Sequence, residues 1–474
     1  MKSSDSFASL GDVSLGLTLV ALSMTLWAAD ASAAEAGVAR DTPVASASIQ
    51  SEIEELRAEI DAFRHDHERR WIDEIRRDEI CAAVADVIAD AGSRASFAEG
   101  GFTAGWNKGF KLVSPDGAFS LKLSGEMQLW YVVNHRRGDQ DLPRNPPGTL
   151  WGAENRRTRL RFSGHVGDPS IQYIVQATIP PVVGPFLLEF GSIRFVLSPE
   201  IDVEVGQFRP QFLREWNVPV FNQLAVDRSV VAAYFSPGFA QGVQLSWKTD
   251  RLKLVGWFGD GIGARMLGPA RTNSMNTPWH RTPTRWAFTG RAEWKPMGEW
   301  SQFNDFTSPP DSPTGLLVGV DVMGQEVGAE IPFAEGTVVL GSSADVSLEL
   351  GGASMMVSGV WQHQESRESS ARNPWGLTAQ VGVYVAPDVE VFGRYAILDY
   401  DSAIEVAPRT ARYNGFTVGW NWFANPQVKL TMDWGMNFAS LGSGEFVSTA
   451  IGYRVDEPGQ GHQWSWRTQL QLLF

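Results

Sequence analysis

The C-terminal segment alternates between apolar and polar side chains, and this pattern constrains the fold more than any other feature of the chain. Apolar and aromatic side chains dominate one face of an extended strand: Trp464, Trp466, Thr468, Leu470, Leu472 and Phe474. Polar side chains occupy the other face: Gln463, Ser465, Arg467, Gln469 and Gln471. A soluble edge strand this apolar would promote aggregation, whereas a strand between lipid and water requires such alternation. The chain end therefore predicts a membrane β-barrel.

The same period of two recurs from Gly117 onward. Between 119 and 133 apolar residues occupy most odd positions, and polar residues occupy even ones. Sixteen segments follow this pattern: 118–134, 155–166, 171–179, 186–197, 201–208, 242–249, 252–258, 285–295, 315–322, 341–350, 354–362, 375–385, 389–399, 413–422, 427–438 and 463–474. An even number of two-faced strands is typical of outer-membrane barrels. We predict an all-β fold, a transmembrane antiparallel β-barrel of about 16 strands over residues 117–474.

The connections between these segments alternate in length. Tight turns are expected at Asp168-Pro169, Pro199-Glu200, Thr249-Asp250, Gly351-Gly352, Pro387-Asp388 and Asn425-Pro426. Long loops are expected at 135–154, 209–241, 259–284, 363–374, 400–412 and 439–462. Short turns at one rim and long loops at the other are typical of outer-membrane barrels. Two connections depart from this rule, the short link after Ile179 and the long one from Pro296 to Thr314.

The N-terminus has the features of an exported protein. An apolar stretch from Val13 to Trp27 follows Lys2, and Ala31-Ser32-Ala33 supplies the small residues that signal peptidases recognise. We predict a signal peptide over residues 1–33. The alternative is a membrane anchor, but the stretch is shorter than the ~20 residues that a membrane-spanning helix needs.

Residues 34–116 form an arm of different character. We predict linkers over 34–48 and 92–116 and a helical, coiled-coil segment over 49–91. Its apolar positions have coiled-coil spacing: Ile49, Ile53, Leu56, Ile60 and Phe63. An amphipathic helix that packs on its own barrel is the alternative. Residues 1–100 hold 9 of the 40 basic and 19 of the 54 acidic side chains, so most of the net charge of −14 lies before the barrel.

The sequence lacks the familiar catalytic and metal-binding patterns. It has no serine-hydrolase, zinc-protease, phosphate-loop or calcium-loop motif. The single cysteine, Cys81, excludes an internal disulfide and a multi-cysteine metal site. We therefore expect no enzyme activity, no catalytic residue, no metal, no cofactor and no nucleic-acid partner.

Arginines provide the strongest functional signal. Arg157, Arg159 and Arg161 share one face of a predicted strand, and we call these three residues the arginine ladder. Each would cost about 2–4 kcal/mol against lipid near the membrane midplane, so we expect them to line the lumen. A spacing of about 6.6–6.8 Å would let an anion pass from one to the next. The alternative is that they pair with carboxylates on an inward-folded loop and only shape the pore.

The segment 205–238 supplies a second group of arginines. It is too apolar to remain in water as an extended loop, so we expect it to fold into the barrel and narrow the channel. Arg209, Arg214 and Arg228 would then lie at the constriction, where Glu215 and Asp227 could neutralise two of them. Four further basic residues have the parity of inward-facing positions: Lys122, Arg285, Arg291 and Arg394.

Several motifs resemble those of the phosphate-selective porin O and P family of outer-membrane proteins. They are GFKLVSPDGAFSLKLSGEMQLWYV (109–132), RRTRLRFSGHVGDP (156–169), GQFRPQFLRE (206–215), SPGFAQGVQLSW (236–247) and the terminal Phe474. The resemblance covers roughly residues 105–474. It implies a sixteen-stranded, usually trimeric channel that favours phosphate or related anions, with Phe474 recognised by the barrel-assembly machinery. The chain departs from the family in having few lysines in the barrel region and slightly more acidic than basic residues there.

These observations predict a porin in the outer membrane of a Gram-negative-type envelope. We expect passive diffusion of small solutes with a modest preference for anions, a homotrimer in contact with outer-membrane lipid, and no chemical reaction. The alternative is a structural barrel, closed by its own loops, whose N-terminal helix tethers the outer membrane to the cell wall.

Overall fold

The computed structural model describes residues 101–136, 148–179, 186–262, 284–327, 336–366, 369–399, 401, 412–438 and 462–474. The chain divides into two compact units, residues 1–101 and 102–474. The expected signal peptide, first linker and helical arm lie outside the described residues, so they stay predictions. The second unit contains all the elements described below.

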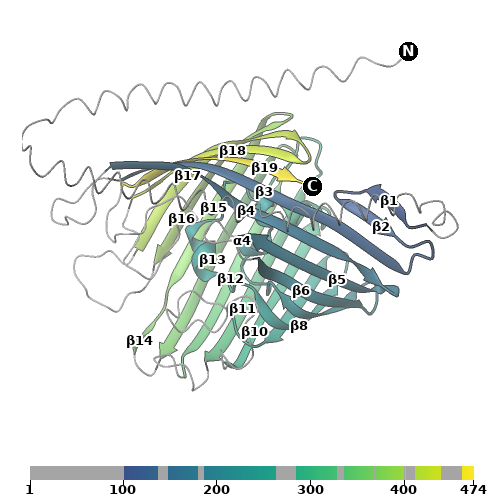
Figure 1. Cartoon of the computed structure of the whole chain (residues 1–474). Helices are drawn as coiled ribbons and strands as arrows, with labels where there is room; N and C mark the ends of the chain where they lie inside the picture. Colours follow the sequence, from purple (N-terminus) through teal and green to yellow (C-terminus); the bar gives the residue numbers. More distant parts are fainter. Residues whose placement is uncertain are drawn as a thin grey trace, which may run out of the picture. The chain divides into compact units, whose positions relative to one another are not determined.

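Sixteen antiparallel strands form a closed barrel (Figure 1). They are β3 (Phe119–Arg136), β4 (Gly148–Val166), β5 (Asp168–Ile179), β6 (Leu187–Val196), β7 (Ile201–Phe208), β8 (Ala240–Lys248), β9 (Leu252–Gly259), β10 (Thr284–Met297), β11 (Gly315–Val327), β12 (Val338–Glu349), β13 (Ala353–Ser366), β15 (Trp375–Ala386), β16 (Val389–Asp399), β17 (Arg412–Asn425), β18 (Val428–Asn437) and β19 (Trp464–Leu473). Each strand pairs with its neighbour in sequence, and β19 pairs with β3. The predicted fold class and every predicted strand are confirmed.

Three short strands were not predicted. The strands β1 (Thr103–Trp106) and β2 (Phe110–Val113) form a hairpin within the expected linker 92–116, and β2 pairs with β3. The strand β14 (Ser369–Arg372) pairs with β13 inside an expected loop. In addition, β4 begins at Gly148, where a loop was expected, because residues 148–155 extend the pairing with β3.

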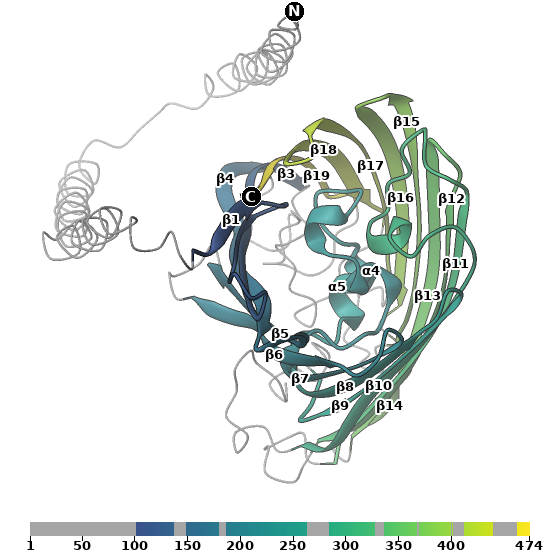
Figure 2. The ribbon, with the colours of Figure 1, turned by 90° about the vertical axis from the view of Figure 1, so that its right-hand side faces the viewer.

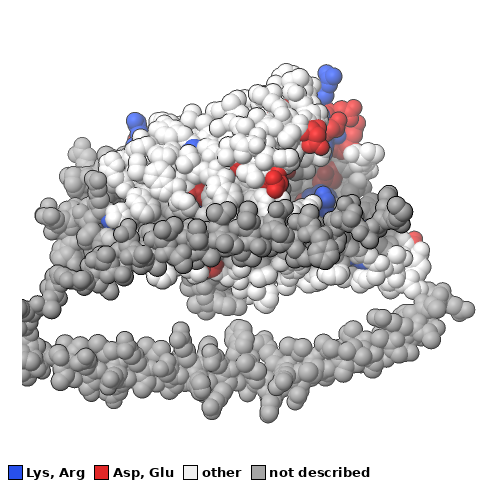
Figure 3. All heavy atoms as spheres, turned by 90° about the horizontal axis from the view of Figure 1, so that it is seen from above, with Lys and Arg blue, Asp and Glu red and all other residues white. Residues whose placement is uncertain are grey.

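The two faces of the barrel wall have opposite chemistry. On β19, Trp466 and Leu470 are 41% and 46% exposed on the outside, whereas Gln469 is 1% exposed on the inside. The surface seen in Figure 3 is mostly uncharged, and its charged residues lie mainly towards the right-hand edge. An apolar outer wall of this kind matches lipid. Among the described residues, no helix is long and apolar enough to cross a membrane.

The long connection between β7 and β8, residues 209–239, lies inside the ring of strands, and we call it the lumen loop (Figure 2). It contains α4 (Arg214–Asn217), the 3-10 turn η3 (Val220–Asn222) and α5 (Val230–Phe235). Ser229 caps α5 by accepting a hydrogen bond from the backbone of Ala232. Buried apolar residues of the loop, such as Phe212 and Phe235, pack in one cluster with wall residues such as Leu398. The loop therefore has an apolar core of its own within the barrel, as its composition predicts.

A second connection also reaches the lumen. Residues 298–314, which we call the rim segment, join β10 to β11 and contain the 3-10 turn η5 (Gln302–Asn304). Phe306 is buried in a cluster with Val218 and Leu224 of the lumen loop. The long connection noted from Pro296 to Thr314 is thus a structural feature. It lies at the rim of short turns and packs against the lumen loop from there.

The C-terminal residue completes the barrel closure. The backbone of Phe474 exchanges two hydrogen bonds with Gly125 of β3, at N–O distances of 2.6 and 3.0 Å. A Cβ added at Gly125 would lie 2.5 Å from the Phe474 ring and 2.7 Å from the Arg159 carbonyl oxygen. A glycine is therefore required where the last residue meets the first barrel strand.

Candidate functional site

The arginine ladder faces the lumen from β4, opposite polar residues of β3. The register aligns Arg157 with Gln128, Arg159 with Glu126, and Arg161 with Ser124. All three are partly buried. Because strand pairing fixes these neighbours, each arginine meets a different set of acceptors.

Two arginines of the ladder pair with carboxylates. Arg159 lies 2.5 Å from Glu126 and donates to Glu189 of β6 at 2.8 Å. Arg157 donates to Asp227 of the lumen loop at 2.8 Å and to Gln128 at 3.0 Å. Charge-assisted contacts of this length hold both guanidinium groups in place.

Arg161 is different. It makes no ion pair with any described residue, and its guanidinium lies 5.8 Å from the ring centre of Phe190. A guanidinium over an aromatic face keeps its positive charge and most of its donors. Arg161 therefore presents to the lumen a positive charge that no ion pair with a described residue neutralises, although Glu204 and Glu126 lie near enough to act on it.

A bulge in β4 brings a fourth arginine to this wall. Pairing with β3 skips Arg156, which lies between Asn155 and Arg157. Both Arg156 and Arg157 lie over the ring of Trp130, at 5.0 and 5.8 Å. Trp130 faces inward and donates its indole N–H to Gln469. Neither residue was predicted to line the lumen. The even position of Trp130 indicates the inward face, whereas a bulge such as that at Arg156 leaves no clear sequence signal.

The lumen loop presents Arg209 and Arg228 towards the same region. Both guanidinium groups lie over Trp216, at 5.8 and 4.6 Å. Arg228 donates to the backbone carbonyls of Glu215, Trp216 and Val218, and Arg209 to that of Asn217. Neither forms an ion pair with a carboxylate of the described residues. These backbone carbonyls accept hydrogen bonds without cancelling the charge, and the Nε of Arg209 has no partner among the described residues.

The pKa values of these loop groups reflect their crowding. Burial lowers the pKa of Arg209 to about 10, and the positive charge of Arg159 adds to the shift. Burial opposes ionisation of Asp227, but the adjacent Arg157 and Arg156 hold its pKa below the usual value. At neutral pH all of these groups are charged.

Positive charge exceeds negative charge at this site, which we call the arginine cluster. Six guanidinium groups belong to it: Arg156, Arg157, Arg159, Arg161, Arg209 and Arg228. Four carboxylates pair with them: Glu126, Glu154, Glu189 and Asp227. The net charge of the cluster is therefore two positive charges.

The other predicted basic residues lie elsewhere. Arg214 donates to the carbonyl of Phe303 in the rim segment and to Ser347 of β12, so it links the loop to the opposite rim. Arg291 is fully buried between Glu293, Asp321 and Asp345, at 2.7–2.8 Å. Arg394 donates to the Asp227 carbonyl at 2.8 Å.

Two residues stand apart from these contacts. Lys122 is on the inward face of β3 and has no ion pair with a described residue. Arg285, which was predicted to face inward, does not face the lumen. The register shifts between Thr284 and Trp286, and the exposed Arg285 pairs with Glu326 at 2.6 Å. Glu326 alternates with the buried Gln325 and Val327, so this pair lies on the outer side of the wall.

Comparison with known proteins identifies the fold. No protein-family model matches the chain, and no curated protein matches it. Among solved structures, the anion-selective porin from Comamonas acidovorans superimposes with a TM-score of 0.53 and 11% identity, covering 75% of this chain and 100% of that chain. Outer-membrane expressed OmpT of Vibrio cholerae superimposes with a TM-score of 0.50 and 8% identity, covering 75% of this chain and 98% of that chain. The chain has the fold of outer-membrane porins.

Proposed function

We propose that the protein is a passive diffusion channel of the outer membrane for small solutes, with a preference for anions. The observation that carries this proposal is the arginine cluster, in which six guanidinium groups face four carboxylates. Low-dielectric walls focus such a field into the lumen and raise the local concentration of counter-ions. Diffusion requires no reaction, so we assign no catalytic residue and no cofactor.

The preferred anion follows from the chemistry of the cluster. Guanidinium groups bind phosphate and carboxylate through paired donors, and Arg161 has donors to offer. We propose phosphate as one permeant anion, in line with the family resemblance. The anion-selective porin from Comamonas acidovorans shares the fold, which is compatible with this proposal without testing it.

The remaining expectations complete the proposal. A signal peptide would export the chain, and Phe474 would be recognised by the barrel-assembly machinery. The barrel would contact outer-membrane lipid and associate as a homotrimer, with the N-terminal arm as a periplasmic coiled coil or a contact with the cell wall.

The reversal potential of the refolded full chain in a planar bilayer tests the anion preference. In a potassium chloride gradient we expect the sign that corresponds to chloride permeation, and titration with phosphate should then reduce the chloride current. A reversal potential of the cation sign would refute the anion preference. An unchanged chloride current would refute phosphate binding.

A second candidate function rests on the filling of the lumen. Inward-facing Gln128, Asn421 and Thr431 are 0% exposed, and the lumen loop meets the rim segment. A barrel closed in this way could serve as a structural protein whose arm tethers the membrane to the cell wall. Negligible conductance together with co-sedimentation with cell wall would favour this alternative.

A further inference from the structure

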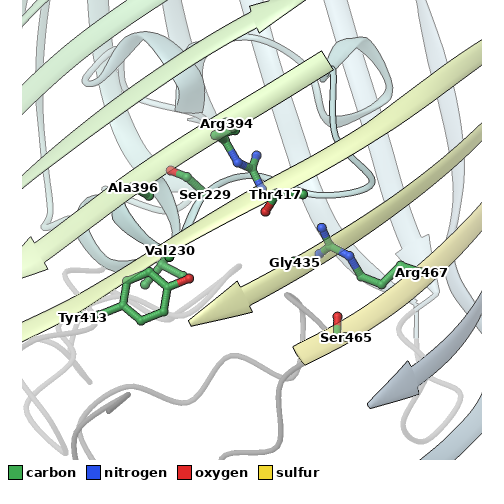
Figure 4. Close-up of a pocket in the computed structure, with 10 residues that line it drawn as sticks. Ser229, Val230, Arg394, Ala396, Tyr413, Thr417, Gly435, Ser465 and Arg467 are labelled. Carbon is green, nitrogen blue, oxygen red and sulfur yellow. The ribbon is translucent and has the colours of Figure 1, made fainter. Parts of the chain in front are cut away.

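A pocket lies between the lumen loop and the wall formed by β16, β17, β18 and β19 (Figure 4). Its cavity volume is about 20 Å³, which is room for one species of about the size of a water molecule. The polar side chains that line it are Ser229, Arg394, Tyr413, Thr417, Ser465 and Arg467. Gly415 and Gly435 also line it, so parts of β17 and β18 contribute no side chain to the space. None of the described residues that line the pocket is a carboxylate.

Arg394 retains hydrogen-bond donors that could serve a ligand. Its Nη1 donates to the Asp227 carbonyl at 2.8 Å and lies 3.4 Å from Glu215. The Glu215 oxygens already accept short hydrogen bonds from the backbone and hydroxyl of Ser229. The Nε and Nη2 atoms of Arg394 make no hydrogen bond with a described residue. In Figure 4 the Arg394 guanidinium points towards Thr417.

The other lining groups are held in place or have donors to offer. Arg467 is oriented by Asp433, which accepts from its Nε at 2.7 Å and from its Nη2 at 2.6 Å. Asp433 also accepts from the Val226 backbone at 3.0 Å. The hydroxyls of Thr417 and Ser465 form no hydrogen bond with any described residue. The pocket thus presents the unused donors of Arg394, the Arg467 guanidinium that Asp433 pairs with and orients, and two hydroxyl groups.

The pocket is linked to the arginine cluster through one residue of the lumen loop. The side chain of Asp227 accepts from Arg157, and its backbone carbonyl accepts from Arg394. Asp227 therefore lies between positive groups on two different parts of the barrel wall. The Asp227 carboxylate pairs with Arg157 of β4. Arg394 of β16 has only a longer contact with a carboxylate, that of Glu215 at 3.4 Å.

We propose that this pocket is a second anion-binding site, specific for small inorganic anions of the size of a halide. Arg394 on β16 and the Thr417 hydroxyl on β17 would contact the anion, and the Arg467 guanidinium, which Asp433 orients, would line the site from β19. The proposal extends the anion preference proposed above and rests on it for its role in transport. An anion would then have two positive sites in the lumen, one on each side of Asp227.

Bromide, which is visible by its anomalous scattering, tests the site directly. Crystals of the refolded full chain soaked in sodium bromide should show an anomalous peak within contact distance of Arg394 and Thr417. In Arg394→Gln we expect the bromide concentration for half occupancy to rise at least about tenfold, because a charge-assisted contact is lost. Arg161→Gln is the matched control, since it removes an arginine from the cluster and should leave the pocket peak in place.

Absence of a bromide peak in the unmodified protein would overturn the proposal, as would a peak unchanged in Arg394→Gln. If Arg394→Gln fails to show the heat-modifiable gel mobility of a folded barrel, Thr417→Val provides the test. This variant keeps size and charge, and we expect reduced bromide occupancy.

The reversal potential separates this proposal from the proposed function. A bromide peak in a channel without anion preference would refute the function and retain the site. Anion preference without a peak would retain the function and refute the site.

Discussion

Arg161 and Arg291 are the same residue type on inward faces of the same barrel, yet their surroundings are opposite. Arg291 contacts Glu293, Asp321 and Asp345 and has no exposed side-chain surface. Arg161 is partly exposed, and among the described residues its guanidinium lies over the ring of Phe190. An inward arginine is therefore not in itself an anion site.

The difference arises from the neighbouring strands. Arg291 lies on β10 next to β11, and two aspartates of β11 and β12 meet its guanidinium. Arg161 lies between β3 and β5, where Ser124 and Gln176 are its register partners. Buried charge needs a partner of opposite sign, so the first arginine is structural, whereas the second supplies the field of the lumen.

The largest expected effect is the loss of Arg291. Arg291→Gln leaves three carboxylates buried around a neutral amide, and breaking a buried ion pair costs about 3–5 kcal/mol. Unfolding of the refolded barrel in urea, followed by the loss of heat-modifiable mobility, measures this cost. A loss below about 1 kcal/mol would show that the network is not structural.

Asp227 is expected to affect both stability and selectivity. Asp227→Asn removes one of the four carboxylates of the arginine cluster, so the permeability ratio of chloride to potassium should increase. Loss of the charged contact to Arg157 should cost about 1–3 kcal/mol. Reversal potential and urea unfolding report the two effects, and an unchanged or lower chloride preference would contradict the proposed field. Asn222→Ala, elsewhere on the loop, is a control for general loosening of the loop.

Arg161→Gln is expected to change ion selectivity more than stability, in contrast to Arg291→Gln. It should decrease the chloride preference by removing unpaired positive charge, while stability changes by only about 0.5–1 kcal/mol, the size of an exposed cation–π contact. Arg285→Gln is the matched control, because that arginine pairs with Glu326 on the outer side of the wall. Equal selectivity changes in the two variants would refute the distinction between inward and outward arginines.

Ionic strength provides the smallest expected effect. The Debye length falls from about 10 Å at 0.1 M salt to about 3 Å at 1 M, and buried pairs are screened much less. The chloride preference should therefore decrease at high salt, whereas the stability difference between the unmodified protein and Arg291→Gln should persist. A selectivity independent of salt would indicate size exclusion in place of an electrostatic field.

The sixteen strands could be predicted from the sequence because the signal is local. Alternation along β19 reflects lipid on one side and the lumen on the other, and each strand carries that signal by itself. The hairpin of β1 and β2 and the early start of β4 were missed because they depend on pairing with β3. The outward position of Arg285 was missed because a register shift reverses the alternation at the end of β10.

The sequence by itself determined the barrel, the inward face of the arginine ladder and the folding of an apolar loop into the lumen. All three follow from the local alternation of apolar and polar residues along the chain. They also follow from the free-energy cost of exposing apolar surface to water or placing charge in lipid. Only the tertiary structure decided which arginines are neutralised. Arg157 and Asp227 are 70 residues apart, and Arg291 and Asp345 are 54 apart. Such pairs depend on strand register and on the path of the lumen loop, which no local pattern in the sequence specifies.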